Sequence, residues 1–60
     1  MELWIARDRS DILRIYYNKP KVNHKTQEII SHGEYYEIGI NLFPEVTFEN
    51  SPRKVKIELV

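Results

Sequence analysis

The 60-residue chain contains no cysteine, only two glycines and no long apolar run. The missing cysteine excludes disulfides and a thiol nucleophile, and it fits a reducing compartment. No apolar stretch approaches the roughly 20 residues of a membrane-spanning helix, and the acidic second residue is not typical of a signal peptide. We therefore expect a single small domain, residues 1–60, located in the cytoplasm.

Charge is balanced overall but uneven along the chain. Nine Lys and Arg match nine Asp and Glu, whereas a protein that binds long duplex nucleic acid is normally basic overall. Residues 1–25 carry six Lys and Arg against three acids, and residues 26–52 carry five Glu and no Lys or Arg. Either these segments are neighbours in the fold, or they form a local basic patch or pair between subunits.

Two apolar runs near the N-terminus, 2–7 and 12–17, predict a β-hairpin around the polar cluster Asp8–Asp11. An odd register would place Arg14 on the inner face, which is costly in a core. We therefore predict an even register with a turn of three or five residues. The inner face then carries Leu3, Ile5, Leu13 and Ile15, and the outer face carries Trp4, Ala6, Arg14 and Tyr16. Arg14 could lie over Trp4 or beside Tyr16 as a cation–π contact.

Two more strands are predicted by alternation, at 34–40 and 54–59. In the last strand the side chains expected inside are Val55, Ile57 and Leu59, and the likeliest neighbour is the first strand. Asn41 and Pro44 suit one short helical turn near 42–46. The overall expectation is a mainly β fold, a small antiparallel sheet of about four strands with that turn at one end.

The stretch 21–32 is open to two interpretations. As a helix it would begin at Asn23 and end before Gly33. As an extended segment it would hold a short strand over 27–31. The helix has few apolar positions at helical spacing, and Ile29 and Ile30 are β-branched, so a loop with a short strand is favoured.

Several segments resemble a set of small bacterial and phage proteins that have no assigned function. They are the LWIARD opening, Lys19-Pro20 and the FPEVTFENSP segment with the alternating strand after it, together about half the chain. The chain departs from that set at Phe48, where the set has Trp, and over 21–32, which matches nothing in it. The resemblance implies no catalytic residue; it implies an accessory or mobile-element origin.

No catalytic motif is present, neither a phosphate-binding loop nor a dinucleotide fingerprint nor a serine-hydrolase elbow. The serines and aspartates stand in expected turns, where bonding to the backbone explains them. On a helix, His24, Glu28 and His32 would be stacked, but the two histidines would then lie about 12 Å apart, too far to share one ion. We predict a non-enzymatic protein with no metal and no cofactor.

Binding is therefore the expected function, with two candidate surfaces. The first is the outer face, whose Trp, Tyr and Arg content is typical of an interface with a host protein or a second copy, most simply in a twofold dimer. Its residues are Trp4, Arg14, Tyr16, Tyr35 and Tyr36. The alternative is a loop that sequesters an anionic nucleotide or cyclic nucleotide by phosphate pairing and base stacking. Its residues are Tyr17, Lys19, Lys21, His24 and Lys25.

Overall fold

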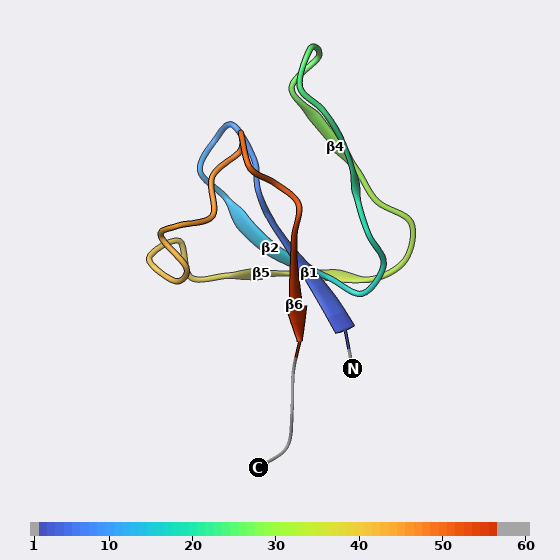
Figure 1. Ribbon diagram of the computed structural model, residues 1–60, viewed down its shortest axis with the longest axis vertical. Helices are drawn as coiled ribbons and strands as arrows, with labels where there is room; N and C mark the ends of the chain where they lie inside the picture. The colour runs from blue at the N-terminus through green and yellow to red at the C-terminus, as the bar shows by residue number, and fades with distance from the viewer. Residues whose placement is uncertain (1, 57–60) are drawn as a thin grey trace.

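The computed structural model describes residues 2–56, which form six β-strands in two sheets (Figure 1). The strands are β1 (Glu2–Arg7), β2 (Leu13–Tyr16), β3 (Lys21–Asn23), β4 (Glu28–Ile30), β5 (Tyr35–Ile38) and β6 (Arg53–Lys56). Over this part of the chain no helix is long and apolar enough to cross a membrane.

The larger sheet has four strands in the order β5-β2-β1-β6, and every neighbouring pair is antiparallel. This confirms the prediction of a mainly β fold built on a four-stranded antiparallel sheet. It also confirms the pairing of the last strand with the first, where Val55 lies opposite Leu3. Val55 is half-buried as expected, while the other two predicted inner residues, Ile57 and Leu59, lie outside the described residues.

The first hairpin has the predicted even register. Trp4 lies opposite Tyr16 and Ile5 opposite Ile15, so opposed residue numbers sum to 20, and five residues separate the last pair, Arg7 and Leu13. Asp8 shapes this turn, since its Oδ1 accepts from the N–H groups of Ser10 (2.8 Å) and Ile12 (3.0 Å). The aspartate is therefore a turn residue, as its position between the strands indicated.

One face of the sheet carries the core. Ile5 and Leu13 are fully buried, and Val46, from the loop after β5, packs onto them. The half-buried residues around them are Ile15, Ile38 and Val55. The loop between β5 and β6 therefore supplies the second layer that a single sheet lacks.

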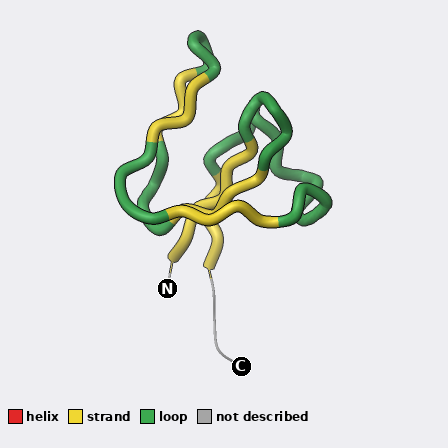
Figure 2. Tube along the Cα trace, turned by 180° about the vertical axis from the view of Figure 1, so that it is seen from behind, coloured by secondary structure: helices red, strands yellow, loops and turns green. Residues whose placement is uncertain are grey.

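The stretch 21–32 forms a second hairpin, β3–β4, where a loop with one short strand was expected. The predicted strand is there as β4, but β3 was not foreseen; Val22 lies opposite Ile29 across this two-stranded sheet. Asn23 closes the turn, because its side chain accepts from the N–H groups of Lys25 (3.0 Å) and Thr26 (3.2 Å). Figure 2 shows the hairpin projecting beyond the main sheet.

The segment near 42–46 folds as hydrogen-bonded turns rather than as the expected turn of helix. The N–H of Leu42 donates to Gly39 at 3.0 Å and that of Val46 to Phe43 at 2.9 Å. Phe43 has a φ of 49°, an uncommon backbone conformation for an aromatic residue. The positive φ of Phe43 is incompatible with a right-handed helical turn, and the carbonyls of Leu42, Phe43 and Val46 accept from Arg7 instead.

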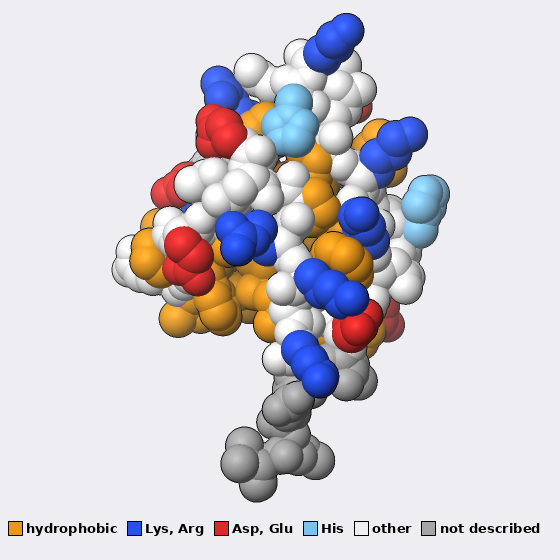
Figure 3. Space-filling view, viewed as in Figure 1, with side chains coloured by type: hydrophobic (Ala, Val, Ile, Leu, Met, Phe, Trp, Pro, Cys, Tyr) orange, Lys and Arg blue, Asp and Glu red, His pale blue; other side chains and the backbone are white. Residues whose placement is uncertain are grey.

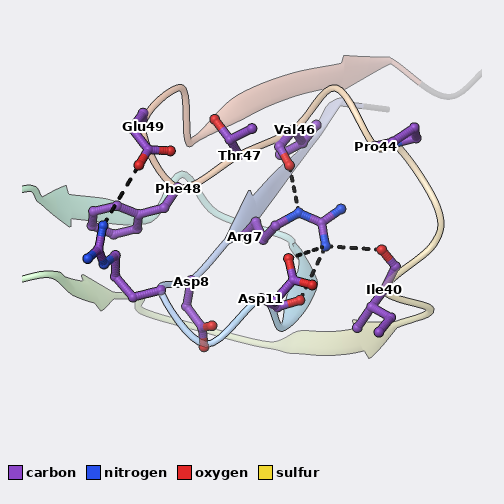
Figure 4. A pocket seen from close by; sticks show the side chains of 10 residues that line it. Arg7, Asp8, Asp11, Ile40, Pro44, Val46, Thr47, Phe48 and Glu49 are labelled. Atoms are coloured by element: carbon purple, nitrogen blue, oxygen red, sulfur yellow. Dashed lines mark hydrogen bonds and ion pairs between the residues drawn. The ribbon is translucent and has the colours of Figure 1, made fainter.

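Arg7 stands at the end of β1, 7% exposed, and its guanidinium is surrounded by carbonyl oxygens (Figure 4). Nε donates to Val46 at 2.6 Å, and one terminal nitrogen donates to Ile40 at 3.0 Å and to both backbone and side chain of Asp11 at 3.2 Å. The other terminal nitrogen donates to Leu42 (3.1 Å) and Phe43 (3.3 Å). The buried charge is thus fully hydrogen-bonded, which is the condition for tolerating it.

We expect Arg7→Lys to lower the free energy of unfolding by about 2–4 kcal/mol, since an ammonium cannot satisfy this fork of carbonyls. Arg9→Lys is the matched control, because the Arg9 side chain is 51% exposed, and it should cost under about 0.5 kcal/mol. Urea unfolding followed by circular dichroism compares the two. Equal midpoints would show that Arg7 does not hold the loop.

The core assignment predicts a second contrast, between two leucines. Leu13→Ala should cost about 2–5 kcal/mol because Leu13 is fully buried, whereas Leu42→Ala should cost under about 0.5 kcal/mol because Leu42 is 52% exposed. Thermal unfolding of both variants measures the difference. A Leu42 variant as destabilised as the Leu13 variant would place the core elsewhere.

Candidate functional site

A groove with a cationic rim lies between the start of β3 and the approach to β6. We call it the basic groove; its lining residues are Lys19, Pro20, Lys21, Val22, His24, Ser51 and Pro52. Its volume of about 370 Å³ falls in the range of small-molecule sites, roughly 300–1,000 Å³. The two prolines and the valine make an apolar floor, and the two lysines and the histidine stand around it.

Both ends of the rim are held by aromatic rings. The Lys19 ammonium lies 5.2 Å from the centre of the Trp4 ring, a cation–π contact. At the other end the His24 ring meets the buried Phe48 edge-on at 5.1 Å, and the Arg9 guanidinium lies 5.7 Å from that same ring. Aromatic contacts of this kind limit the positions of otherwise mobile cationic side chains.

Figure 3 shows that Lys and Arg side chains gather on one face of the molecule, over β6 and the β3–β4 hairpin. Lys54 contributes from the strand position opposite Trp4, and its ammonium pairs with Glu2 at 3.1 Å. Both partners of this pair are more than half exposed, so the pair is weak and screened by salt. A chain of zero net charge therefore presents a locally basic face.

The structure brings together three of the five residues predicted for an anionic ligand. Lys19, Lys21 and His24 line the basic groove. Lys25 lies instead in the turn of the β3–β4 hairpin, and the ring of Tyr17 packs against Tyr36, 5.9 Å between centres. Neither of these two residues lines the groove.

The predicted interface residues are divided between buried and exposed positions. Tyr16 is only 3% exposed and has almost no surface to offer a partner, and Trp4 and Arg14 are half-buried. Tyr35 and Tyr36 are 50% and 52% exposed. Of the predicted set, only the two tyrosines of β5 are broadly accessible.

The β3–β4 hairpin lies beside the outer face; within residues 2–56 its strands make no close backbone contact with those of the main sheet. Ile29 and Ser31, in and beside β4, line a hollow together with Arg14, Tyr16 and Tyr35 of the main sheet. Ala6 beneath is 1% exposed.

Arg14 lies beside the Tyr16 hydroxyl, as one of the two expectations had it, and its cation–π contact is with Tyr35 rather than with Trp4. Its guanidinium is 5.7 Å from the Tyr35 ring centre and bonds to the Asp8 carboxylate at 3.2 Å. Burial raises the pKa of the Tyr16 hydroxyl, an effect that the nearby Arg14 charge opposes. The register explains the contact with Tyr35, because β5 places Tyr35 directly opposite Tyr16 and thus within reach of Arg14.

The pocket beside Arg7 is larger, about 400 Å³, but it is not an anion site (Figure 4). Every N–H of the Arg7 side chain already has a carbonyl or carboxylate acceptor, so none is left for a ligand. Sequence reasoning did not single out Arg7. The signal was available, since the even register puts Arg7 on the inner face with Leu3 and Ile5.

No group of three His, Asp or Glu side chains within residues 2–56 is placed to hold a metal ion. Of the three residues that would be stacked on a helix, His24 lines the basic groove and Glu28 begins β4. Ser51, which stands at the groove's edge, accepts from the Arg7 backbone N–H at 2.9 Å and donates to Thr47 at 2.6 Å. Its hydroxyl is thus committed to the fold.

Comparison of the chain with protein-family models, with curated proteins and with solved structures finds no match. The resemblance to small bacterial and phage proteins therefore stays a prediction. Function has to be argued from the basic groove and from the exposed tyrosines of β5.

Proposed function

We propose that this protein acts by binding rather than by catalysis, and that its basic groove holds an anionic ligand of nucleotide type. One observation carries the proposal: Lys19, Lys21 and His24 line a single groove, which is completed by Ser51 and Pro52 from a distant part of the chain. An accessory role, in which the protein sequesters or senses such a ligand, fits its small size and the absence of a catalytic motif.

The groove suits both parts of a nucleotide. Lys19 and Lys21 supply ammonium donors, and charge-assisted hydrogen bonds to phosphate are about twice as strong as neutral ones. Pro52 and Val22 are half-buried and offer apolar surface against which a base can lie, whereas Pro20 is fully buried. A volume of about 370 Å³ favours a mononucleotide or cyclic nucleotide over a longer strand.

Trp4 provides a reporter of binding, because it is the only tryptophan and Lys19 lies over its ring. A phosphate that draws the Lys19 ammonium toward the groove changes the surroundings of the indole. Fluorescence excited at the red edge of tryptophan absorption, where nucleotides absorb little, follows the change. A thermal shift on the same samples gives an independent readout, since a ligand at about 100 times its Kd adds about 2.7 kcal/mol of stability.

We expect Lys21→Gln to weaken nucleotide binding about three- to tenfold, the loss of one charge-assisted contact at an exposed site. Lys25→Gln is the matched control: it removes the same charge from the same hairpin but outside the groove, and it should leave the affinity unchanged. A panel of mononucleotides, cyclic nucleotides and cyclic dinucleotides is titrated against both variants and the natural chain.

Two results would contradict the proposal. One is a flat response to the whole panel at millimolar ligand in both readouts. The other is equal weakening by Lys21→Gln and Lys25→Gln, which would mean that general attraction to positive charge, and not the groove, accounts for binding. Tighter binding of a single-stranded oligonucleotide than of any mononucleotide would likewise replace the proposed ligand with a polymer.

A further inference from the structure

The two edge strands of the four-stranded sheet, β5 and β6, differ in whether their residues discourage pairing with another chain. β6 carries Arg53, Lys54 and Lys56, and lysine on an edge strand discourages pairing with another chain. β5, with the sequence Tyr35-Tyr36-Glu37-Ile38, has no lysine, arginine or proline. Its burial is also low, with three of four residues exposed. The unprotected edge is therefore β5.

The backbone groups that β5 turns outward follow from its pairing with β2. In an antiparallel pair, opposed residues alternate between those that exchange hydrogen bonds and those that do not. The N–H of Tyr17 donates to Glu34 at 3.2 Å, so Glu34, Tyr36 and Ile38 are the positions bonded to β2. Tyr35 and Glu37 then direct their N–H and C=O groups to the open edge.

We infer that β5 pairs antiparallel with β5 of a second copy of this chain, about a twofold axis that passes beside Tyr36. Tyr35 of each copy lies opposite Glu37 of the other, and their outward groups exchange four backbone hydrogen bonds. The two main sheets then continue into one of eight strands. Twofold pairing uses the same surface on both copies, as a self-complementary interface requires.

The neighbouring registers are less favourable. An axis beside Glu37 would set two carboxylates directly opposite each other, which is destabilising. An axis beside Tyr35 would set Glu37 opposite Gly33, whose φ of 102° is not that of an extended strand. The register centred on Tyr36 avoids both: Tyr35 lies opposite Glu37, and Ile38 lies opposite Glu34, the residue just before β5.

Side chains at the centre of this interface support the same register. Tyr36 lies at a position that does not bond to the added strand, where opposed Cα atoms are about 4.5 Å apart and side chains meet closely. The Tyr36 ring is 52% exposed and is held in place by Tyr17 of its own chain, so two Tyr36 rings would meet at the axis. Opposed aromatic residues on neighbouring strands contribute roughly 0.2–1 kcal/mol each.

This edge differs from the face first predicted for a dimer. Tyr16 of that outer face is only 3% exposed, whereas pairing along β5 uses exposed residues and leaves the β3–β4 hairpin and the basic groove in place. Self-association is thus independent of the ligand proposed above, and either can fail without the other.

The register is tested by cross-linking, which the absence of natural cysteine makes clean. Disulfides need Cα atoms roughly 4.4–6.8 Å apart, and opposed Tyr36 positions meet this requirement. Tyr36→Cys should therefore give a covalent dimer of twice 7.2 kDa in a glutathione redox buffer at micromolar protein. Tyr17→Cys, at a position equally exposed but off the edge strand, should stay monomeric on gels under the same conditions.

A non-covalent test uses sedimentation of the natural chain and two lysine variants. Tyr36→Lys would place two ammonium groups together at the axis and should raise the dimer dissociation constant at least about tenfold, whereas Tyr17→Lys should change it far less. A single species near 7.2 kDa at hundreds of micromolar natural chain would overturn the inference. So would a dimer that Tyr36→Lys leaves intact, or cross-linking at Tyr17 as rapid as at Tyr36.

Discussion

The buried guanidinium of Arg7 is the interaction on which the rest of this structure depends. It reaches from the end of β1 to four carbonyls of the segment 40–46 and to the turn at Asp11, while its backbone N–H engages Ser51. The loop it gathers carries Val46 onto Ile5 and Leu13, so the same residue that satisfies its own charge also closes the core. This chain has no disulfides and a small core, so its fold depends on one buried arginine where a larger domain would have a second layer of secondary structure.

The β3–β4 hairpin decides which surfaces remain available. Ile29 and the nearby Ser31 line a hollow with three residues of the main sheet, and Lys21 and His24 form one wall of the basic groove. Asn23 makes this possible, since its side chain and carbonyl together close the hairpin turn. A segment whose composition gave no clear structural prediction therefore supplies part of the basic groove.

The two proposed surfaces are separate in space and in physical character. The basic groove combines exposed cations with an apolar floor, so its binding should weaken as salt screens the lysines. The β5 edge relies on backbone hydrogen bonds and on the Tyr36 ring, which salt affects little. Because β6 is guarded by lysine and arginine while β5 is not, pairing along one edge ends in a closed twofold dimer and does not continue into a fibre.

Local patterns in the sequence were sufficient for the main sheet. Alternation of apolar and polar residues located β1, β2, β5 and β6, and the cost of burying Arg14 selected the even register, because both depend only on residues a few positions apart. The tertiary structure decided the rest. Arg7 bonds to carbonyls 33 to 39 residues away, and the groove joins Lys19 and Lys21 to Ser51 and Pro52; no local pattern encodes such distant partners. The burial of Tyr16 likewise depends on contacts across the molecule, with the Tyr35 ring of β5 and beside the hollow that Ile29 lines, and not on the propensities of its own strand.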